Sequence, residues 1–546
     1  MRPRAIVASL LFGAALGVGG WWLKQVPVFE EPALEPVVDP SVGPRLFEQV
    51  QQLIATRYVD SIPMDSLYRK AIAGLVDELD DPYSAFLPER RLARLNEQMN
   101  GNYAGVGMSL GQRDGWITVI EPLPGAPADR AGVLAGDRVI AIAGESTRGL
   151  SNDEAIRLLR GEPGTSVNVT LDRLGIGRVD VRLTRESVTR RAVERAMVLH
   201  GKVGYVDLKV FNQNTVSELQ QAIDSLVRLG GATSLILDLR GNPGGLLEQG
   251  VAVAEMFLDP PQRIVELRGR PGTPAGLTTD RDVQPWTQLA LAVLVDGNSA
   301  SASEIVAGAL QDNDRAIIVG RTSYGKGSAQ SVFPMTIGGA LRLTTARWYT
   351  PLGRSISPER DTTGDEEGVF RPRMPDDSLR PRYTTPGGRA VRGGGGIVPD
   401  VIAGDTVMPL MVRDFVRELG DQVPAYRAAM ERLALSMRQR GLVKGPLEPV
   451  TREMVEELWR DLERRRLPVT RASFDAAAPW IARALGYELA RVTFGADAEF
   501  LRRTQHDPVI TRALRLLDGV ATPREPFSRA EDPSVLVPVP EPTFDE

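Results

Sequence analysis

The stretch Leu291-Ala-Val-Leu-Val-Asp-Gly-Asn-Ser-Ala-Ser-Ala-Ser-Glu304 joins a run of apolar residues to a segment with helical character. A junction between a strand and a helix is where α/β proteins place reactive groups. The serines have an ordinary explanation, because Ser301 or Ser303 could cap the helix. They also have a chemical one, in which Ser301 Oγ points into a cleft and the Ala302 N–H donates to a developing oxyanion, supported by the helix dipole.

A nucleophilic serine needs a base, and the composition restricts the choice. The chain has no cysteine and only two histidines, His200 and His506, neither of which lies in a motif-like context. A cysteine nucleophile is therefore excluded, and a Ser-His-Asp triad is disfavoured. The remaining candidate is a lysine whose pKa is lowered by burial.

One lysine lies in a suitable loop. Lys326 is part of Ser323-Tyr-Gly-Lys-Gly-Ser-Ala-Gln330. A lysine in a glycine-rich loop is usually a solvated surface charge. The catalytic interpretation requires a neutral Lys326 near Ser301 Oγ, with the Gln330 amide orienting the amine.

The same loop resembles a phosphate-binding loop, since Gly320-Arg-Thr-Ser-Tyr-Gly-Lys326 matches most of that motif. However, Gly327 stands where Ser or Thr would coordinate magnesium, and the residues after it look more extended than helical. A nucleotide triphosphatase is therefore disfavoured, and we predict no nucleotide, metal or other cofactor.

A second dense turn, Asp238-Leu-Arg-Gly-Asn-Pro-Gly-Gly245, follows the apolar run Leu235-Ile-Leu237. Glycine and proline suit a tight turn for backbone reasons alone. In the catalytic interpretation, the N–H of Gly244 or Gly245 is a second oxyanion donor, and the sequence does not choose between them.

The N-terminus has the pattern of a membrane segment. Arg2 and Arg4 precede an uncharged apolar run from Ala5 to Leu23. As a helix this run would span roughly 28 Å, close to the hydrocarbon thickness of a bilayer. It ends in Trp21-Trp22 and lacks a small-residue cleavage site, so we expect an uncleaved anchor rather than the alternatives, a signal peptide or a buried soluble helix. The arginines favour a cytoplasmic N-terminus, with the body on the far side of the membrane.

Length and composition indicate a soluble multi-domain body. The chain has 546 residues, of which 42% are hydrophobic and 25% charged, and its net charge of −5 gives no support for nucleic-acid binding. The expected order is an anchor or signal (1–25), a linker (26–45), an N-terminal helical region (46–100), a β-rich module (101–187), an α/β core (188–405), a helical C-terminal region (406–517), and a Pro- and acid-rich disordered tail (518–546).

The central region alternates strands with helices. Its strands, such as Leu235-Ile-Leu237 and Leu291–Val295, are near-continuous apolar runs, typical of a sheet covered on both faces. The β-rich module is expected to hold a groove between a strand edge, beginning with Gly105, Val106, Gly107 and Met108, and the helix Ser151–Leu159. An extended peptide could add there as a strand; the alternative is a structural β domain without a ligand.

Taken together, these motifs resemble the C-terminal processing peptidases, the tail-specific serine proteases of family S41. The resemblance covers roughly Leu46 to Asp405. The matching stretches are Asp81-Pro-Tyr-Ser84, Gly105-Val-Gly-Met108, Ala135-Gly-Asp137, Gly204-Tyr-Val206, Asp238–Gly245, Ser299–Ile305, Gly320–Gln330, Tyr349-Thr-Pro-Leu-Gly-Arg354 and Gly396-Ile-Val-Pro-Asp400.

The resemblance implies an α/β protease core of the ClpP/crotonase-like type with an inserted PDZ-like β module and helical flanks. Ser301 resembles the nucleophile, Lys326 the general base and Gln330 the residue that positions it. Ala302 and Gly244 or Gly245 match the oxyanion donors. Arg160 matches a PDZ arginine that in some members couples tail binding to assembly of the active site.

The family pattern also implies a function and a location. It implies a serine endopeptidase that cleaves unstructured C-terminal tails of proteins in the bacterial cell envelope, anchored in the inner membrane with its catalytic part in the periplasm. The alternative is an inactive PDZ scaffold that only binds peptides. The helical region after Val407 is longer than the minimal family pattern, and we expect it to serve homo-oligomer formation, adaptor binding or regulation.

Overall fold

The computed structural model describes residues 42–532, apart from 114, 124, 174–175, 272–275, 280–282, 337, 359–378 and 405–407. The expected membrane anchor and residues 533–546 lie outside this part. Within it, none of the helices combines the length and the apolar character needed to cross a membrane. The chain divides into two units, one ending at Asp80 and one beginning at Asp81.

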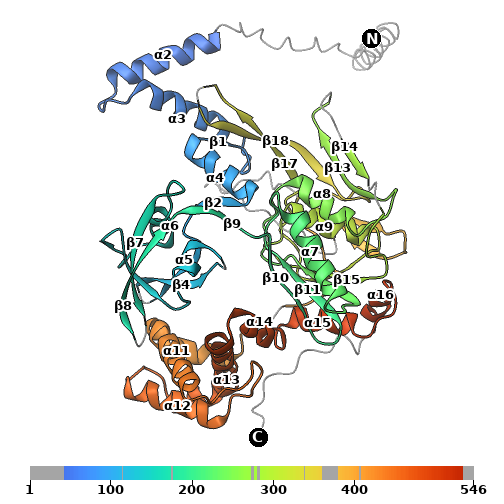
Figure 1. The fold of residues 1–546 in the computed structure, drawn as a ribbon. Coiled ribbons are helices and arrows are strands. Elements are labelled where there is room, and N and C mark those ends of the chain that lie inside the picture. Colours follow the sequence, from blue (N-terminus) through green and yellow to red (C-terminus); the bar gives the residue numbers. More distant parts are fainter. Residues whose placement is uncertain are drawn as a thin grey trace, which may run out of the picture. The chain divides into compact units, whose positions relative to one another are not determined.

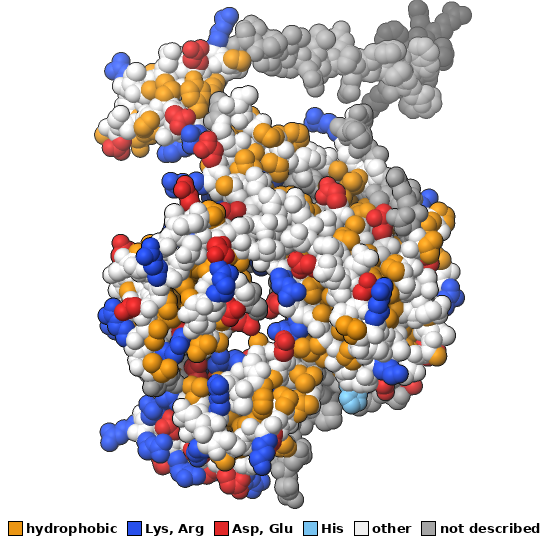
Figure 2. Space-filling view, viewed as in Figure 1, with side chains coloured by type: hydrophobic (Ala, Val, Ile, Leu, Met, Phe, Trp, Pro, Cys, Tyr) orange, Lys and Arg blue, Asp and Glu red, His pale blue; other side chains and the backbone are white. Residues whose placement is uncertain are grey.

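The first unit is a pair of helices, α2 (Val42–Arg57) and α3 (Met64–Asp77), with Pro63 as the N-cap of α3. The apolar periodicity of this segment predicts helices, as observed. Much of their apolar surface is exposed (Figure 2), including Phe47 and Leu53.

The second unit is built around a six-stranded sheet in the order β10-β11-β12-β15-β16-β21. All neighbouring strands are parallel except β10, which runs antiparallel to β11. Their bounds are β10 (Val193–Val198), β11 (Val203–Leu208), β12 (Ser234–Asp238), β15 (Ala290–Val295), β16 (Ile317–Gly320) and β21 (Val401–Ile402).

Both faces of this sheet are covered, as the continuous apolar strands predict. Leu237 and Val293 pack against α7 (Thr215–Arg228), α8 (Leu247–Glu255) and α9 (Ala302–Asp312). On the other face, Ile236, Ala292 and Leu294 pack against α15 (Pro508–Leu517), whose buried residues are Val509, Ile510, Ala513, Leu516 and Leu517 (Figure 1). The sheet therefore depends on a helix that is distant in sequence.

A smaller antiparallel sheet carries the lysine loop. Its path is β1-β18-β13-β14, and β17 pairs with β18. The strands are β1 (Ala85–Leu87), β13 (Arg263–Gly269), β14 (Gly276–Thr279), β17 (Ser328–Pro334) and β18 (Ala340–Tyr349), and a hairpin of β19 (Arg382–Thr384) and β20 (Ala390–Arg392) follows.

The β-rich module has its own core and a sheet in the order β3-β4-β5-β7-β8, with β3 at one edge. Ser151 and Glu154 form a capping box at the start of α6. The elements are β3 (Met108–Arg113), β4 (Trp116–Pro122), α5 (Pro127–Arg130), β5 (Arg138–Ile142), β6 (Glu145–Ser146), α6 (Asn152–Leu159), β7 (Ser166–Arg173) and β8 (Gly177–Thr184).

A two-stranded ribbon connects this module to the rest of the unit. It consists of β2 (Asn102–Gly105), which follows α4 (Glu89–Asn100), and the antiparallel β9 (Glu186–Thr189), which leads into β10.

The C-terminal region does not form a single bundle. Helices α10 (Leu410–Leu419), α11 (Val423–Gln439), α12 (Arg452–Arg464) and α13 (Arg471–Phe494) share a core of their own, and the 3₁₀ turn η2 (Gly420–Gln422) links the first two. The chain then continues through α14 (Ala496–Thr504) to α15 on the central sheet.

One expectation about the tail is wrong. We predicted disorder from Asp518, but α16 (Glu525–Ala530) is a helix, and its Phe527 and Ala530 pack against the α15 side of the central sheet. Proline-rich composition pointed to disorder, whereas these apolar side chains find a partner surface that the local sequence does not reveal.

A buried ion pair ties the end of α9 to the chain that follows β18. Arg354 is fully buried, contacts the buried Asp312 carboxylate and donates to Gln311 Oε1 at 2.9 Å. We expect Arg354→Met to lower the free energy of unfolding by about 3–5 kcal/mol, because it leaves a buried carboxylate unpaired. Urea unfolding followed by circular dichroism measures this. The exposed Arg347→Met on β18 should change stability by at most about 0.5 kcal/mol, and equal losses in both variants would contradict the assignment.

Candidate active site

The three serines of the β15–α9 junction have different environments. Ser299 Oγ donates to Leu239 O at 2.8 Å and Ser303 Oγ donates to Asn242 O at 2.9 Å, and both serines are buried. Ser301, between them, is only half-buried and is the N-cap of α9, with φ 56° and ψ −114°. Non-glycine residues rarely adopt that conformation, and such strain gathers at functional sites. Two serines thus hold the turn, while the strained one keeps an accessible side chain.

The Glu304 carboxylate joins this turn to the lysine loop. It is completely buried and accepts from the Ser301 N–H (2.8 Å) and the Lys326 N–H (2.9 Å), both on Oε2. Its Oε1 accepts from Ser323 Oγ (2.5 Å) and the Gly325 N–H (2.6 Å). Burial raises the pKa of Glu304, and these hydrogen bonds oppose the rise. The backbones of Ser301 and Lys326 therefore lie two hydrogen bonds apart.

The loop after β12 lies directly against the serine turn. The Asn242 carbonyl accepts from the Ala300 N–H at 3.0 Å. Gly244 has φ 93°, and a Cβ there would lie 2.9 Å from both Ser301 Cβ and the Ala302 nitrogen. Only glycine permits this approach, because any side chain would push the two segments apart.

The hydrogen bonds of this loop distinguish the two glycines. The Gly244 N–H is occupied, since it donates to Asn242 Oδ1 at 2.9 Å. The N–H groups of Gly245 and Ala302 make no hydrogen bond with any residue that the structure describes. Two unpaired donors thus lie beside Ser301, one from the β12 loop and one from the start of α9.

The Lys326 side chain lies against an aromatic ring from the start of the second unit. Its Nζ is 4.9 Å from the centroid of the Tyr83 ring. Arg342 Nε donates to Tyr83 O at 2.9 Å, and Ser84 Oγ accepts from the Thr344 N–H at 3.1 Å. The segment Asp81–Ser84 is therefore fastened to β18, and it covers the lysine.

This enclosure changes the pKa values of Lys326 and Tyr83. Burial lowers the pKa of Lys326, Arg342 lowers it further, and Glu304 and Asp81 act in the opposite direction. Burial also raises the pKa of Tyr83 well above its usual value, so the phenol stays neutral. The Tyr83 ring is part of the surroundings that keep water from the amine, which favours the uncharged lysine, while the face of the ring attracts an ammonium and acts in the opposite direction.

The Gln330 side chain does not reach Lys326 in this arrangement. Its amide donates to Ser328 Oγ (2.9 Å) and Thr344 Oγ1 (3.2 Å). The β17–β18 register shifts between Ala329 and Gln330, and such a bulge re-aims the side chain beside it. The structure thus brings the backbones of Ser301, Ala302, Gly245 and Lys326 close together, and it leaves the Gln330 side chain on the strand.

The geometry of the lysine loop and the positions of the two histidines bear on the P-loop and Ser-His-Asp alternatives. The lysine loop continues into the strand β17, as its extended pattern predicts, whereas a P-loop lysine lies at the start of a helix. His200 and His506 lie away from Ser301, near α14 and α15. Among the described residues, no group of three or more acidic or histidine side chains could hold a metal ion.

Sequence reasoning missed three groups of this site: the Glu304 carboxylate, the Tyr83 ring and Asn242. Glu304 carried a signal, because it lies three residues after an expected N-cap, the position of a capping box. Tyr83 lies in a matching motif of the resemblance, although nothing in its own surroundings indicates a lysine.

The peptide-groove residues also lie together. Gly105, Val106, Gly107, Met108 and Arg160 line one cavity of about 120 Å³ with Tyr103, Leu110, Ile156 and Leu159. The cavity lies between α6 and β3, which pairs on one side only, with β4. Its wall is mainly apolar, and the free strand edge offers backbone groups to an extended chain.

Three models of known protein families match separate parts of the chain. A model of peptidase family S41 matches residues 202–367, a PDZ domain model matches 118–173, and a model of the N-terminal domain of the activating protease CtpB matches 43–90. The carboxy-terminal processing protease CtpA of Bacillus subtilis (strain 168) is 32% identical over 319 residues, which cover 58% of this chain and 68% of the relative.

Two further matches, one to a curated relative and one to a solved structure, cover more than half of this chain. A carboxy-terminal-processing protease of Bartonella bacilliformis is 38% identical over 316 residues, covering 57% of this chain and 71% of the relative. Among solved structures, the photosystem II D1 C-terminal processing protease shows 29% identity and a TM-score of 0.37, covering 69% of this chain and 97% of that one.

The Glu304 contacts generate a prediction. Glu304→Gln keeps the shape but places an NH₂ group against N–H donors, so buried donors lose their acceptor at about 1–3 kcal/mol each. We expect the free energy of unfolding to fall, and kcat/KM for peptide hydrolysis to drop about 100-fold as Ser301 and Lys326 lose their shared anchor. Glu248→Gln, on an exposed site of α8, is the control. Normal activity in Glu304→Gln would show that the carboxylate does not position the site.

Proposed function

The chain belongs to the carboxy-terminal processing proteases of peptidase family S41, and on that premise we propose that it is an active serine endopeptidase with a Ser-Lys dyad. Its substrates are proteins with exposed, unstructured C-terminal tails. One observation carries the proposal: a single buried oxygen of Glu304 accepts from the N–H groups of both Ser301 and Lys326. Two unpaired N–H groups lie beside the same serine.

In the first chemical step, Ser301 Oγ attacks the carbonyl carbon of a peptide bond, and Lys326 Nζ accepts the hydroxyl proton. The lowered pKa of Lys326 favours the neutral amine that this step requires. The side chain must leave the face of the Tyr83 ring and turn toward Ser301. The backbones of Ser301 and Lys326 are held close together, and the four methylene groups of the lysine can span the distance between them. The movement is therefore a change of side-chain rotamer.

The Gly245 and Ala302 N–H groups are suited to receive the oxyanion. Each is free of internal partners and fixed by a rigid element, and such a donor contributes about 3–4 kcal/mol to lowering the barrier. Gly244 acts differently, because its N–H is taken by Asn242. Its lack of a side chain lets the loop lie against Ser301.

The tetrahedral intermediate collapses when Lys326 returns the proton to the leaving amine, which gives an acyl-enzyme on Ser301. Water then attacks the carbonyl carbon of the ester, and Lys326 takes a proton from that water. As the bond between this carbon and Ser301 Oγ breaks, Lys326 returns the proton to Oγ and the carboxylic acid product leaves. Gln330 lies on the strand after the lysine and would orient the amine once Lys326 turns. No metal or nucleotide takes part in these steps.

The groove between β3 and α6 captures the tail. An extended chain adds to the free edge of β3, its terminal carboxylate meets the N–H groups of the Gly105–Gly107 loop, and an apolar last residue enters between Val106 and Leu159. The bound tail then supplies a nearby peptide segment to Ser301 by raising its effective concentration. An inactive scaffold is not favoured, because peptide binding alone does not require a buried lysine close to an accessible, strained serine.

We also propose a location in the bacterial cell envelope. The apolar run from Ala5 to Leu23, preceded by two arginines, supports an inner-membrane anchor with the protease on the periplasmic side. Detergent-dependent extraction of the full chain tests the anchor, and release by salt alone would contradict it.

The dyad yields a direct prediction. Ser301→Ala and Lys326→Ala should each abolish cleavage of a peptide with a free apolar C-terminus, while both still bind that peptide through the separate groove. Mass spectrometry of the products measures cleavage, and an amidated peptide is the control for recognition of the tail. Full activity in either variant would overturn the dyad assignment.

The surroundings of Lys326 predict a pH profile. Activity should rise with pH through the lowered pKa of Lys326, because only the neutral amine accepts a proton. Tyr83→Ser admits water to the amine, so the rise in activity should move to higher pH. Tyr83→Phe keeps the aromatic ring, so the rise should stay at the pH of the unmodified protein. Arg342, Glu304, Asp81 and Tyr324 also face this site and stay unchanged in both variants. Identical profiles for Tyr83→Ser and Tyr83→Phe would show that the ring does not control the lysine.

A further inference from the structure

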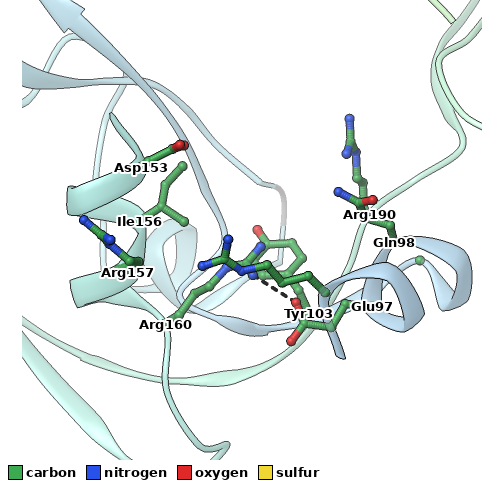
Figure 3. A pocket seen from close by; sticks show the side chains of 10 residues that line it. Glu97, Gln98, Tyr103, Asp153, Ile156, Arg157, Arg160 and Arg190 are labelled. Atoms are coloured by element: carbon green, nitrogen blue, oxygen red, sulfur yellow. Dashed lines mark hydrogen bonds and ion pairs between the residues drawn. The ribbon is translucent and has the colours of Figure 1, made fainter. Parts of the chain in front are cut away.

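A basic pocket adjoins the peptide groove. It has a volume of about 300 Å³ and lies between α4, α6 and the ribbon of β2 and β9 (Figure 3). Four arginines line it, Arg94, Arg157, Arg160 and Arg190, and they face only two carboxylates, Glu97 and Asp153. We call it the arginine pocket.

The positive charge in the arginine pocket is only partly balanced. Arg160 pairs with Glu97 at 2.9 Å across the pocket (Figure 3), and Arg157 lies 3.7 Å from Glu154 at the surface. The side chains of Arg94 and Arg190 have no carboxylate partner among the described residues. In addition, the Nε of Arg160 is buried without an acceptor. Unused donors and unpaired charge both favour an incoming anion.

The Glu97 contact shows which anion fits. A carboxylate already lies against the Arg160 guanidinium, which is itself stacked over the Tyr103 ring at 5.4 Å. The planar guanidinium matches the geometry of a carboxylate, and stacking holds it in place. Two acidic side chains and the apolar Ile156 in the wall make the pocket less suited to a polyanion such as nucleic acid.

The arginine pocket and the peptide groove are neighbouring cavities with a common wall. Tyr103, Ile156 and Arg160 line both cavities. The shared wall lies next to the Gly105–Gly107 loop, where the end of a bound tail is expected. A side chain close to the C-terminus of the tail can therefore enter the arginine pocket while the last residue fills the apolar groove.

We propose that the arginine pocket binds an acidic side chain close to the C-terminus of the substrate tail. The preferred tails thus combine an apolar last residue with a glutamate or aspartate shortly before it. This inference rests on the proposed function, because it specifies the tails that the same groove captures. Arg94 and Arg190 have no carboxylate partner among the described residues, so we expect them to provide the selectivity for an acidic side chain.

The test is peptide binding to the full chain carrying Ser301→Ala, which prevents cleavage. Labelled peptides with a free apolar C-terminus carry a single Glu at each position before the last residue in turn, with Gln at the same position as the reference. Fluorescence anisotropy should show one position at which Glu binds about tenfold more tightly than Gln, the size expected of a charge-assisted contact. That ratio should decrease with added salt.

Arginine variants identify the pocket as the source. In Arg94→Gln or Arg190→Gln the Glu-to-Gln ratio should fall toward one, while Gln peptides bind as before. Arg182→Gln is the matched control, because it removes one exposed arginine from β8 of the same module, outside the pocket. Thermal unfolding midpoints confirm that each variant is folded.

The outcomes separate this inference from the proposed function. A ratio near one at every position, or a ratio unchanged in both arginine variants, overturns the inference and leaves tail capture standing. Inorganic phosphate that binds the arginine pocket without any preference among the peptides would also overturn it, since the pocket would then be a general anion site. If amidated peptides bind as well as free ones, tail capture itself fails, and the inference fails with it.

Discussion

The buried Glu304 carboxylate provides the interactions on which the candidate active site depends. Removing a carboxylate from water is expensive, and this one is stable because four donors surround it, three of them backbone N–H groups. Two of those groups belong to Ser301 and Lys326, so one desolvated charge holds the backbones of the proposed nucleophile and the proposed base close together. A neutral residue could not do this, since an amide or hydroxyl has too few acceptor sites for four converging donors. The strained backbone of Ser301 persists because the same carboxylate restrains it.

The rest of the fold places partners around that carboxylate. The strands β12 and β15 end side by side at one edge of the parallel sheet, which brings the Gly244–Gly245 loop onto the serine turn. The β12 loop is in turn fixed from the opposite face of the sheet. Arg240 pairs with the buried Asp238 at the end of β12 and with Asp507, which caps α15. The β12 loop is therefore tied to a helix from the far end of the chain, so the C-terminal region helps to hold the candidate active site in place.

The sequence predicts the outline of this site better than its details. Ser301 stands out because its neighbours are small and its position precedes a helix, and Lys326 stands out because better bases are missing. The choice between Gly244 and Gly245 depends on where one asparagine amide points, and no local pattern encodes that. Gln330 looks well placed along the chain, yet a β-bulge turns it toward Thr344. The packing of α15 on the sheet also cannot be predicted from the sequence, because an amphipathic pattern shows which face of a helix is buried but not which surface that face covers.

The joint between the peptide module and the protease core is built from a few buried contacts. Asn212 is fully buried and its Nδ2 donates to Arg190 O at 3.0 Å, so it holds the strand leaving the arginine pocket. A Cβ on Gly101, at the other side of the ribbon, would lie 2.6 Å from the same amide, so the packing here has no room for a larger residue. The preceding residue, Phe211, donates to Gly244 O (3.1 Å) and accepts from the Leu246 N–H (2.8 Å), on either side of the free Gly245 N–H. The ribbon beside the PDZ-like module and the loop with the free Gly245 N–H are thus held by two neighbouring residues, Asn212 and Phe211, which gives these two parts of the fold a direct structural connection.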